Sequence, residues 1–175
     1  FQVNKKLVEW NIINENKNSF FVGYEHNEIK TFISKYRKLK DNYYEIVLEK
    51  TPFYAESGGQ IGDSGQIGSS NILFYVEDTY YLDNEICHFG QLKEGSFTAQ
   101  EIEVIASVDN NKRDSLKSNH TSTHLLHKAL KIVLGNEVQQ AGSLVSDNHL
   151  RFDFTYYKKV NSNELNEIEN IVNNI

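Results

Sequence analysis

The spacing of hydrophobic residues changes once along the chain, near Asp109, and this change limits the fold more than any other feature. Before Asp109, short segments rich in β-branched and aromatic residues alternate with turn sequences. Such segments, with no clear helix between them, are typical of a small antiparallel barrel or sandwich. The segments expected as strands are residues 19–25, 43–50, 72–82, 85–92 and 101–109.

Two stretches of this first part are harder to interpret. In residues 29–39 the apolar side chains fit one face of a helix, but the alternation of a strand fits as well. The glycine-rich run at residues 57–68 reads as a turn between strands. It matches neither the phosphate-binding P-loop nor the dinucleotide fingerprint, so its sequence gives no support for a nucleotide site.

After Asp109 the apolar residues recur at intervals of three and four, which predicts an amphipathic helix. Asp109 is a suitable N-cap for this helix, and Gly135 is well placed to end it. Residues 138–145 and 149–156 then predict a β-hairpin.

A second helix is expected over residues 162–174, with Ser162 as its N-cap. Its apolar stripe would consist of Leu165, Ile168 and either Ile171 or Val172. The whole pattern predicts an α+β chain, in which a small antiparallel β-barrel precedes a two-layer α/β subdomain.

Composition excludes several classes of protein. The single cysteine, Cys87, rules out an internal disulfide framework and favours a reducing, cytoplasmic environment. No stretch approaches the roughly 18 apolar residues of a membrane span, so no membrane partner is expected. The net charge of −6 argues against a stand-alone nucleic-acid binder, and no DNA partner is expected.

Histidines on the first expected helix suggest a metal site. His120 and His124 are four residues apart, so their imidazoles lie on one face and are able to share a zinc ion. His120 also lies in the apolar stripe and fits an ordinary half-buried histidine. His127 fits either a third ligand or a structural histidine. Zinc takes four ligands, so these residues describe half of a site.

Several motifs, in this order and spacing, resemble the alanyl-tRNA synthetases in the region of their editing domain. They cover most of the chain: FVGYE at 21–25, TPFYAESGGQIGDSG at 51–65, VDNNKR at 108–113, NHTSTHLLHKALKIVLG at 119–135, QAGSLV at 140–145 and LRFDF at 150–154. The resemblance implies residues 1–18 as the end of an upstream connector, 19–108 as the barrel subdomain, and 109–175 as the start of the editing subdomain.

The resemblance also implies a function. In this family the editing domain hydrolyses serine or glycine wrongly esterified to tRNA(Ala), and a zinc ion is bound by HxxxH and by a later CxxxH. His120 and His124 match the first pair, and Cys87 matches neither member of the second. The second pair is expected beyond Ile175, so we expect a truncated editing module that binds zinc weakly and has little activity alone.

Residue by residue, the family pattern supplies further candidates. The candidate catalytic residues are Gln140, Thr123 and Gln60, and the candidate substrate-binding residues are Gly58, Gly59, Thr121 and Gly142. Polar partners for a serine hydroxyl would be left unsatisfied by alanine, which would therefore be spared. Zinc would either hold the 3′ end and amino group of the substrate or polarise the ester and the attacking water.

Other properties follow from the family alone. The expected partner is the acceptor end of tRNA(Ala), and ATP and magnesium would belong only to the aminoacylation part of a longer protein. No general base is assigned among Glu56, Asp63 and Asp153. Two alternatives stay open: a free-standing trans-editing deacylase, although AESGGQ at residues 55–60 is closer to the synthetase form, and a non-catalytic RNA-docking module.

Overall fold

The computed structural model describes residues 8–14, 19–98 and 102–174, which form two compact units. The first unit comprises Phe1–Ser57 and Ile61–Lys112, and the second comprises Gly58–Gln60 and Arg113–Ile175. Much of the expected connector at residues 1–18, and the first residue of the strand expected at 101–109, lie outside the described residues. Neither described helix is long and apolar enough to cross a membrane.

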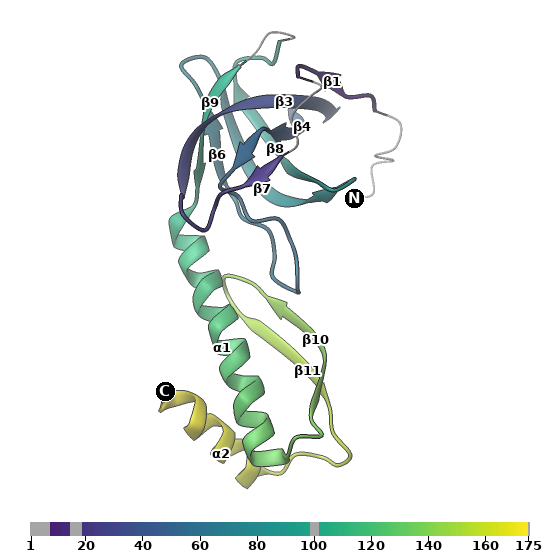
Figure 1. Cartoon of the computed structure of the whole chain (residues 1–175), viewed down its shortest axis with the longest axis vertical. Helices are drawn as coiled ribbons and strands as arrows, with labels where there is room; N and C mark the ends of the chain where they lie inside the picture. The colour runs from purple at the N-terminus through teal and green to yellow at the C-terminus, as the bar shows by residue number, and fades with distance from the viewer. Residues whose placement is uncertain (1–7, 15–18, 99–101, 175) are drawn as a thin grey trace. The chain divides into compact units, whose positions relative to one another are not determined.

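The first unit is an antiparallel β-barrel (Figure 1). Its strands follow the order β3-β4-β8-β7-β6-β9, and β3 pairs back with β9 to close the sheet. Their bounds are β3 Glu28–Lys40, β4 Tyr43–Leu48, β6 Gly65–Gly68, β7 Leu73–Leu82, β8 Glu85–Glu94 and β9 Glu103–Val108. The barrel expected from the sequence is therefore confirmed.

Three short strands complete this unit. β1 (Asn11–Ile12) pairs with β3 outside the closed ring, and β2 (Phe20–Phe21) pairs in parallel with β5 (Lys50–Thr51). Alternating side chains of the barrel strands fill the interior, as period-two burial requires. The fully buried core residues include Ile33, Ile46, Leu48, Ile67 and Phe74 from these strands, and Phe53, which follows β5.

The structure resolves the ambiguous segment and corrects two expectations. Residues 29–39 lie within the 13-residue strand β3, because one long strand pairs with both β4 and β9. The strand expected over 19–25 is reduced to Phe20–Phe21. The glycine-rich run is not only a turn, since its last residues, Gly65–Gly68, form β6 between β7 and β9.

Inside the barrel, His88 is completely buried and bonded on both ring nitrogens. Its Nδ1 lies 2.9 Å from the carbonyl oxygen of Ile46, and its Nε2 lies 2.7 Å from Oγ1 of Thr51. Burial lowers the pKa of His88 to about 4, against an ordinary value of 6.5, although the bond to Ile46 opposes the shift. His88 is therefore a neutral structural histidine.

This burial predicts a pH-dependent stability. Below its ordinary pKa, His88 takes up a proton in the unfolded chain but not in the folded barrel, so stability falls as the pH falls. We expect a loss of about 2 kcal/mol between roughly pH 7 and pH 5, measured by urea denaturation. A His88→Gln variant should lack this part of the pH dependence, whereas a His149→Gln control should keep it. Equal slopes in wild type and His88→Gln would contradict the assignment.

The helix α1 (Asn110–Leu134) follows the barrel and supplies most of the second unit's helical layer. Asp109 caps it as expected, because its Oδ1 accepts hydrogen bonds from the backbone N–H groups of Asn111 and Lys112 at 3.0 and 3.2 Å. Gly135 follows the helix with φ +105°, a conformation that favours glycine.

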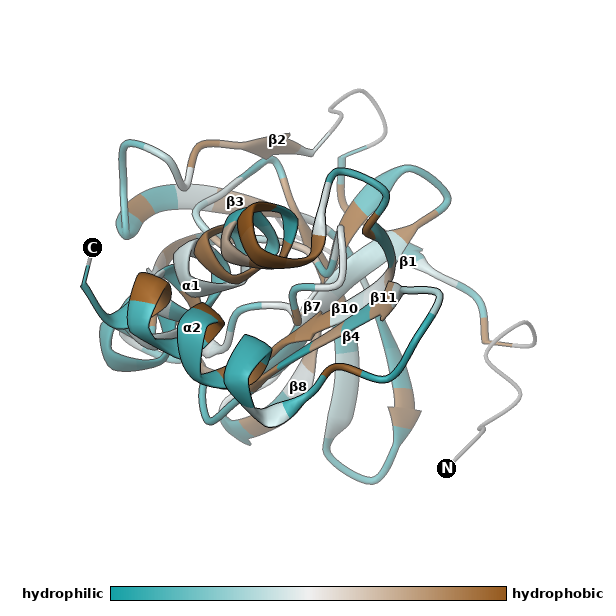
Figure 2. Ribbon diagram, turned by 90° about the horizontal axis from the view of Figure 1, so that it is seen from below, coloured by the Kyte–Doolittle hydropathy of each residue, from teal (hydrophilic) through white to brown (hydrophobic). Residues whose placement is uncertain are grey.

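An antiparallel hairpin and a second helix complete the second unit. The hairpin strands are β10 (Gln139–Val145) and β11 (Leu150–Thr155), and α2 is Ser162–Asn173. The N-cap of α2 is Asn161 rather than Ser162, because Asn161 and Glu164 form a reciprocal capping box. Of the expected stripe, Ile168 is buried but Leu165 is exposed, and Figure 2 shows α2 as mostly hydrophilic.

The core of the second unit is small. Ala129, Leu130 and Leu134 from α1 pack with Val138 and Ile168. Phe152 and Phe154 of β11 are half-buried against the same cluster. The hairpin is therefore held on α1 by aromatic and aliphatic contacts, which leaves the middle of α1 free to carry polar side chains.

Candidate functional site

Two imidazoles meet at the middle of α1. Nε2 of His120 lies 3.0 Å from Nε2 of His124, and the two ring centroids are 4.9 Å apart. His120 is half-buried and His124 is exposed. The helix accounts for this meeting, because side chains four residues apart lie on the same face one turn apart.

Gln60 fixes the ring of His120. Its Oε1 lies 2.8 Å from Nδ1 of His120, and only 8% of Gln60 is exposed. An amide oxygen accepts hydrogen bonds and cannot donate them, so the proton of neutral His120 resides on Nδ1. Its Nε2 therefore carries a lone pair directed at His124.

The segment Gly58–Gln60, called the glycine segment below, places Gln60 at this position. The carbonyl oxygen of Gly59 accepts a 2.7 Å hydrogen bond from the backbone N–H of Val145, and Gln60 forms a parallel bridge with Val145. Gly59 has φ +85°, and a Cβ built on it would lie 2.5 Å from the carbonyl oxygen of Ser143. Only glycine permits both this conformation and this close approach to β10.

A cavity of about 100 Å³ lies beside the imidazoles, within the second unit. It is large enough for a few water molecules or a small polar group. Its walls come from the glycine segment, α1, β10 and β11. The lining residues are Gly58, His120, Thr123, His124, His127, Gln140, Ser143, Val145 and Phe152.

Some of the candidate residues from the sequence line this cavity. Thr123 is buried and its hydroxyl donates to the carbonyl oxygen of Asn119 at 2.8 Å. Gln140 is exposed and its Nε2 donates to Oγ of Ser143 at 3.1 Å. Gly58 also lines the cavity, with φ +60° and open space around its Cα.

Other candidates lie away from the cavity walls. Thr121 is exposed and its hydroxyl donates to the carbonyl oxygen of Lys117, back along the helix. Gly142 faces Asp153 across the hairpin, where a Cβ would lie 3.1 Å from the Asp153 carboxylate. Gly59 and Gln60 do not line the cavity but contact residues that do: Gly59 bonds to Val145 of β10, and Gln60 bonds to His120.

Sequence reasoning missed three lining residues, Ser143, Val145 and Phe152. Two of them fall inside the motif QAGSLV at 140–145, and Phe152 falls inside LRFDF at 150–154. Alternation along β10 and β11 was the available signal, because every second residue of a hairpin faces the same side. The contact of Gln60 with His120 left no such signal, since 60 residues separate the partners.

His127 has an unusual environment. Its Nε2 is buried and has no hydrogen-bond partner among the described residues, and its ring lies 5.1 Å from that of Phe152. A buried polar atom without a partner costs about 1–3 kcal/mol, so Nε2 of His127 reduces the stability of this unit.

Residues 8–14, 19–98 and 102–174 contain no group of three or more His, Cys, Asp or Glu side chains placed to share a metal.

The remaining titratable candidates are occupied elsewhere. Asp63 accepts from the backbone N–H of Tyr54 at 2.6 Å, and Asp153 pairs with Arg151 at 3.1 Å. Nδ1 of His149 lies 3.0 Å from Oγ of Ser146. Cys87 is buried in the barrel strand β8. None of these, nor Glu56, lines the cavity.

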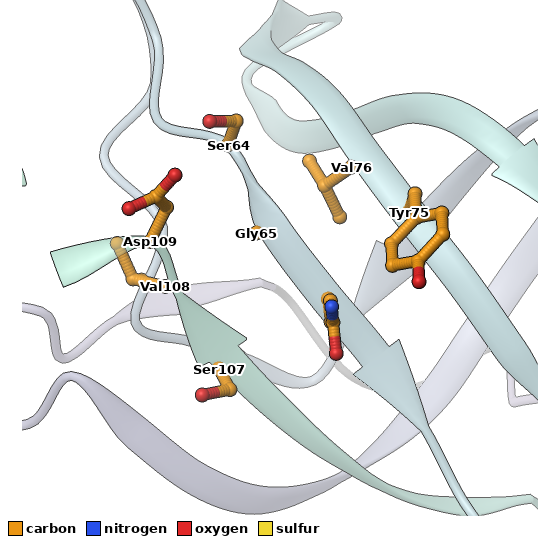
Figure 3. Close-up of a pocket in the computed structure, with 8 residues that line it drawn as sticks. Ser64, Gly65, Tyr75, Val76, Ser107, Val108 and Asp109 are labelled. Atoms are coloured by element: carbon orange, nitrogen blue, oxygen red, sulfur yellow. The ribbon is translucent and has the colours of Figure 1, made fainter. Parts of the chain in front are cut away.

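A second hollow of about 440 Å³ lies on the barrel (Figure 3). Strands β6, β7 and β9 supply its walls, with Ser64, Tyr75, Ser107 and Asp109 among the lining residues. Its one carboxylate, Asp109, is already engaged in capping α1. The paired imidazoles make the smaller cavity of the second unit the better candidate for chemistry.

The sequence is similar to known proteins over most of its length. A family model described as tRNA synthetases class II (A) matches residues 3–112. The chain is 44% identical over 161 residues to an alanine–tRNA ligase of Thermoanaerobacter pseudethanolicus, which covers 87% of the chain and 18% of that protein. It is 42% identical over 161 residues to that of Wigglesworthia glossinidia brevipalpis, with the same coverage.

A third relative matches a larger share of the chain. The alanine–tRNA ligase of Bacteroides fragilis is 43% identical over 169 residues, which cover 94% of the chain and 19% of that protein. The chain thus spans less than one fifth of the length of these relatives.

Proposed function

The chain belongs to the alanyl-tRNA synthetases of class II, and from that premise we propose that its second unit serves to edit misacylated tRNA. The reaction would be hydrolysis of the ester that joins serine or glycine to tRNA(Ala). In the complete protein this activity would accompany the ligation of alanine to its tRNA. The observation that carries the proposal is the oriented imidazole pair beside a small polar cavity.

The imidazole pair fits part of a zinc site. In a tetrahedral zinc site two imidazole nitrogens lie roughly 3.3 Å apart, close to the 3.0 Å between the Nε2 atoms of His120 and His124. The Nδ1 contact of His120 with Gln60 is the kind of second hydrogen bond that metal-binding histidines make. His120 and His124 would hold zinc through Nε2, and a bound zinc would supply a Lewis acid at this end of the cavity.

The cavity residues suggest how serine is distinguished from alanine. Ser143 and Gln140 present a hydroxyl and a side-chain amide beside the imidazoles, and Thr123 lies on the facing helix. A serine hydroxyl can form additional hydrogen bonds with such groups, whereas alanine cannot. The groups would therefore favour seryl over alanyl esters, and the small volume would exclude larger amino acids.

The proposed partner is the acceptor end of tRNA(Ala). The net charge of −6 gives this chain little attraction for phosphate, so most of the RNA affinity would come from other parts of the complete protein. The role of this unit would be to receive the aminoacyl ester rather than to capture the tRNA.

We expect the complete natural protein to hydrolyse Ser-tRNA(Ala) at least about 10-fold faster than Ala-tRNA(Ala), because only serine brings a hydroxyl that can bond to the polar cavity groups. The measurement is the first-order loss of radiolabelled amino acid from each tRNA at equal enzyme concentration. Spontaneous hydrolysis of each ester without enzyme is the control. Equal rates above that control would contradict the proposed selectivity, and no rate above it would contradict the editing function.

A further inference from the structure

We propose that Gln60 is a positioning residue that fixes the tautomer of His120, and that Gly59 is glycine so that Gln60 can do this. The inference rests on the proposed function in one respect only, namely that the unprotonated Nε2 of His120 would bind the metal. The tautomer itself is a property of the metal-free chain and can be tested without zinc or tRNA.

The proton arrangement follows from two contacts in sequence. Oε1 of Gln60 accepts from Nδ1 of His120, which places the proton there and leaves Nε2 of His120 as an acceptor. With both rings neutral, the 3.0 Å contact between the two Nε2 atoms then makes His124 the donor. His120 and His124 should therefore be opposite tautomers, with protons on Nδ1 and Nε2 respectively.

The two rings differ in burial, and this difference determines how firmly the tautomer of each is fixed. Gln60 is more than nine-tenths buried and His120 is half-buried, so the tautomer of His120 is fixed by the protein. His124 is exposed, so its proton can exchange with water. To hold a metal through Nε2, His124 would have to carry its proton on Nδ1 instead, by exchange with solvent, whereas His120 would need no change.

Gly59 makes the contact possible. With φ +85° and a Cβ position 2.5 Å from both the carbonyl oxygen and Oγ of Ser143, any side chain at residue 59 would push the segment off β10. The bond from the N–H of Val145 to Gly59 and the bridge at Gln60 would be lost together. Gln60 would then no longer reach His120.

The test is nitrogen NMR of the metal-free chain with labelled histidine, since ring nitrogen shifts separate protonated from unprotonated positions. We expect wild-type His120 to be protonated on Nδ1 and His124 on Nε2. In Gln60→Leu, His120 should lose its preference for Nδ1 and become predominantly protonated on Nε2, as free imidazole side chains are. Gln60→Glu retains an acceptor oxygen and should keep the proton on Nδ1.

His88 provides an internal control, because its Nδ1 faces the carbonyl oxygen of Ile46 and should stay protonated in every variant. Gly59→Ala should reproduce Gln60→Leu, whereas His149→Gln should match wild type, since His149 bonds to Ser146 in the hairpin turn and does not line the cavity. Wild-type His120 protonated on Nε2 would overturn the inference, and so would an unchanged tautomer in folded Gln60→Leu. If Gln60→Leu does not fold, the wild-type tautomer decides alone.

A zinc titration of the complete protein separates this inference from the proposed function. Gln60→Leu should bind zinc about 10- to 100-fold more weakly than wild type, and Gln60→Glu should bind within a few fold of it. Wild-type affinity in Gln60→Leu would overturn the positioning role even if Ser-tRNA(Ala) is hydrolysed. Conversely, the expected tautomers and affinities in a protein without hydrolytic activity would uphold the inference and remove the editing proposal.

Discussion

Replacing His120 with alanine in the complete protein is expected to lower the hydrolysis of Ser-tRNA(Ala) on the order of 100-fold or more. The substitution removes one of the two converging Nε2 atoms and leaves the Gln60 amide without its partner. Aminoacylation with alanine should change little, because the proposed reaction is confined to the second unit. Deacylation and aminoacylation rates measured on the same preparation give the comparison.

The matched control is His149→Ala. His149 lies in the same unit, bonds to Ser146 in the hairpin turn and does not line the cavity, so its loss should leave deacylation within a few fold of wild type. An unaltered deacylation rate in folded His120→Ala would show that the imidazole pair has no part in the reaction.

Replacing Glu45 with alanine is expected to destabilise the barrel by about 3–5 kcal/mol. Glu45 is fully buried, and its Oε2 accepts from Nε and Nη2 of Arg37 at 2.5 Å. Its Oε1 accepts from the hydroxyl of Tyr80. Burial, nearby Cys87 and the bond to Glu45 raise the pKa of Tyr80 well above its ordinary value, so Tyr80 remains a donor.

The loss of stability in Glu45→Ala is large because the hydrogen-bond partners of Glu45 stay buried after the carboxylate is removed. Arg37 is only 6% exposed, and without Glu45 it becomes a buried cation that has lost its carboxylate, whatever its other contacts. Urea denaturation monitored by tyrosine and tryptophan fluorescence gives the free energy of unfolding. Such a loss would be a large fraction of the 5–15 kcal/mol typical of a folded domain.

Two comparisons separate this mechanism from a general loss of charge. The pair of Lys35 and Glu85 is 21% and 28% exposed at its side chains, so Glu85→Ala should cost less than about 1 kcal/mol. The double variant Arg37→Met, Glu45→Leu should regain much of the lost stability, because neither position then carries a buried charge. A Glu45→Ala loss below that of Glu85→Ala would contradict the account.

The barrel was predictable from the sequence because its strands carry their own signal. The β-branched and aromatic residues of 72–82 and 85–92 predict strands, and these correspond to β7 (Leu73–Leu82) and β8 (Glu85–Glu94) within two residues at each end. The strand β3 was ambiguous, since Ile29, Phe32, Ile33 and Tyr36 fit one face of a helix while alternation along the segment also fits a strand. Its pairing with both β4 and β9 decides the matter, and such pairing is a tertiary property.

The strand β6 was not predicted because of its glycines. Gly65–Gly68 begins and ends with glycine, which is depleted in strands, yet it forms β6 between two partners. The cap of α2 was misplaced by one residue because Asn161 and Ser162 are both good caps. The position of Glu164, three residues after Asn161, decides in favour of Asn161 through the capping box.

The site was predictable only where its residues share one element. The meeting of His120 and His124 follows from helix geometry alone. The approach of Gln60 requires the glycine segment to dock on β10, through contacts of Gly59 with Ser143 and Val145 that are distant in sequence. Long-range contacts of this kind leave no periodic pattern in the sequence.

We propose that His120 and His124 together provide two of the ligands of a zinc site. The most direct measurement is an equilibrium zinc titration of the complete protein, with a competing chelator, for wild type and for the double variant His120→Ala, His124→Ala. We predict one tightly bound zinc per chain in wild type, abolished in the double variant. The same number of zinc ions bound with the same affinity by both proteins would contradict the claim.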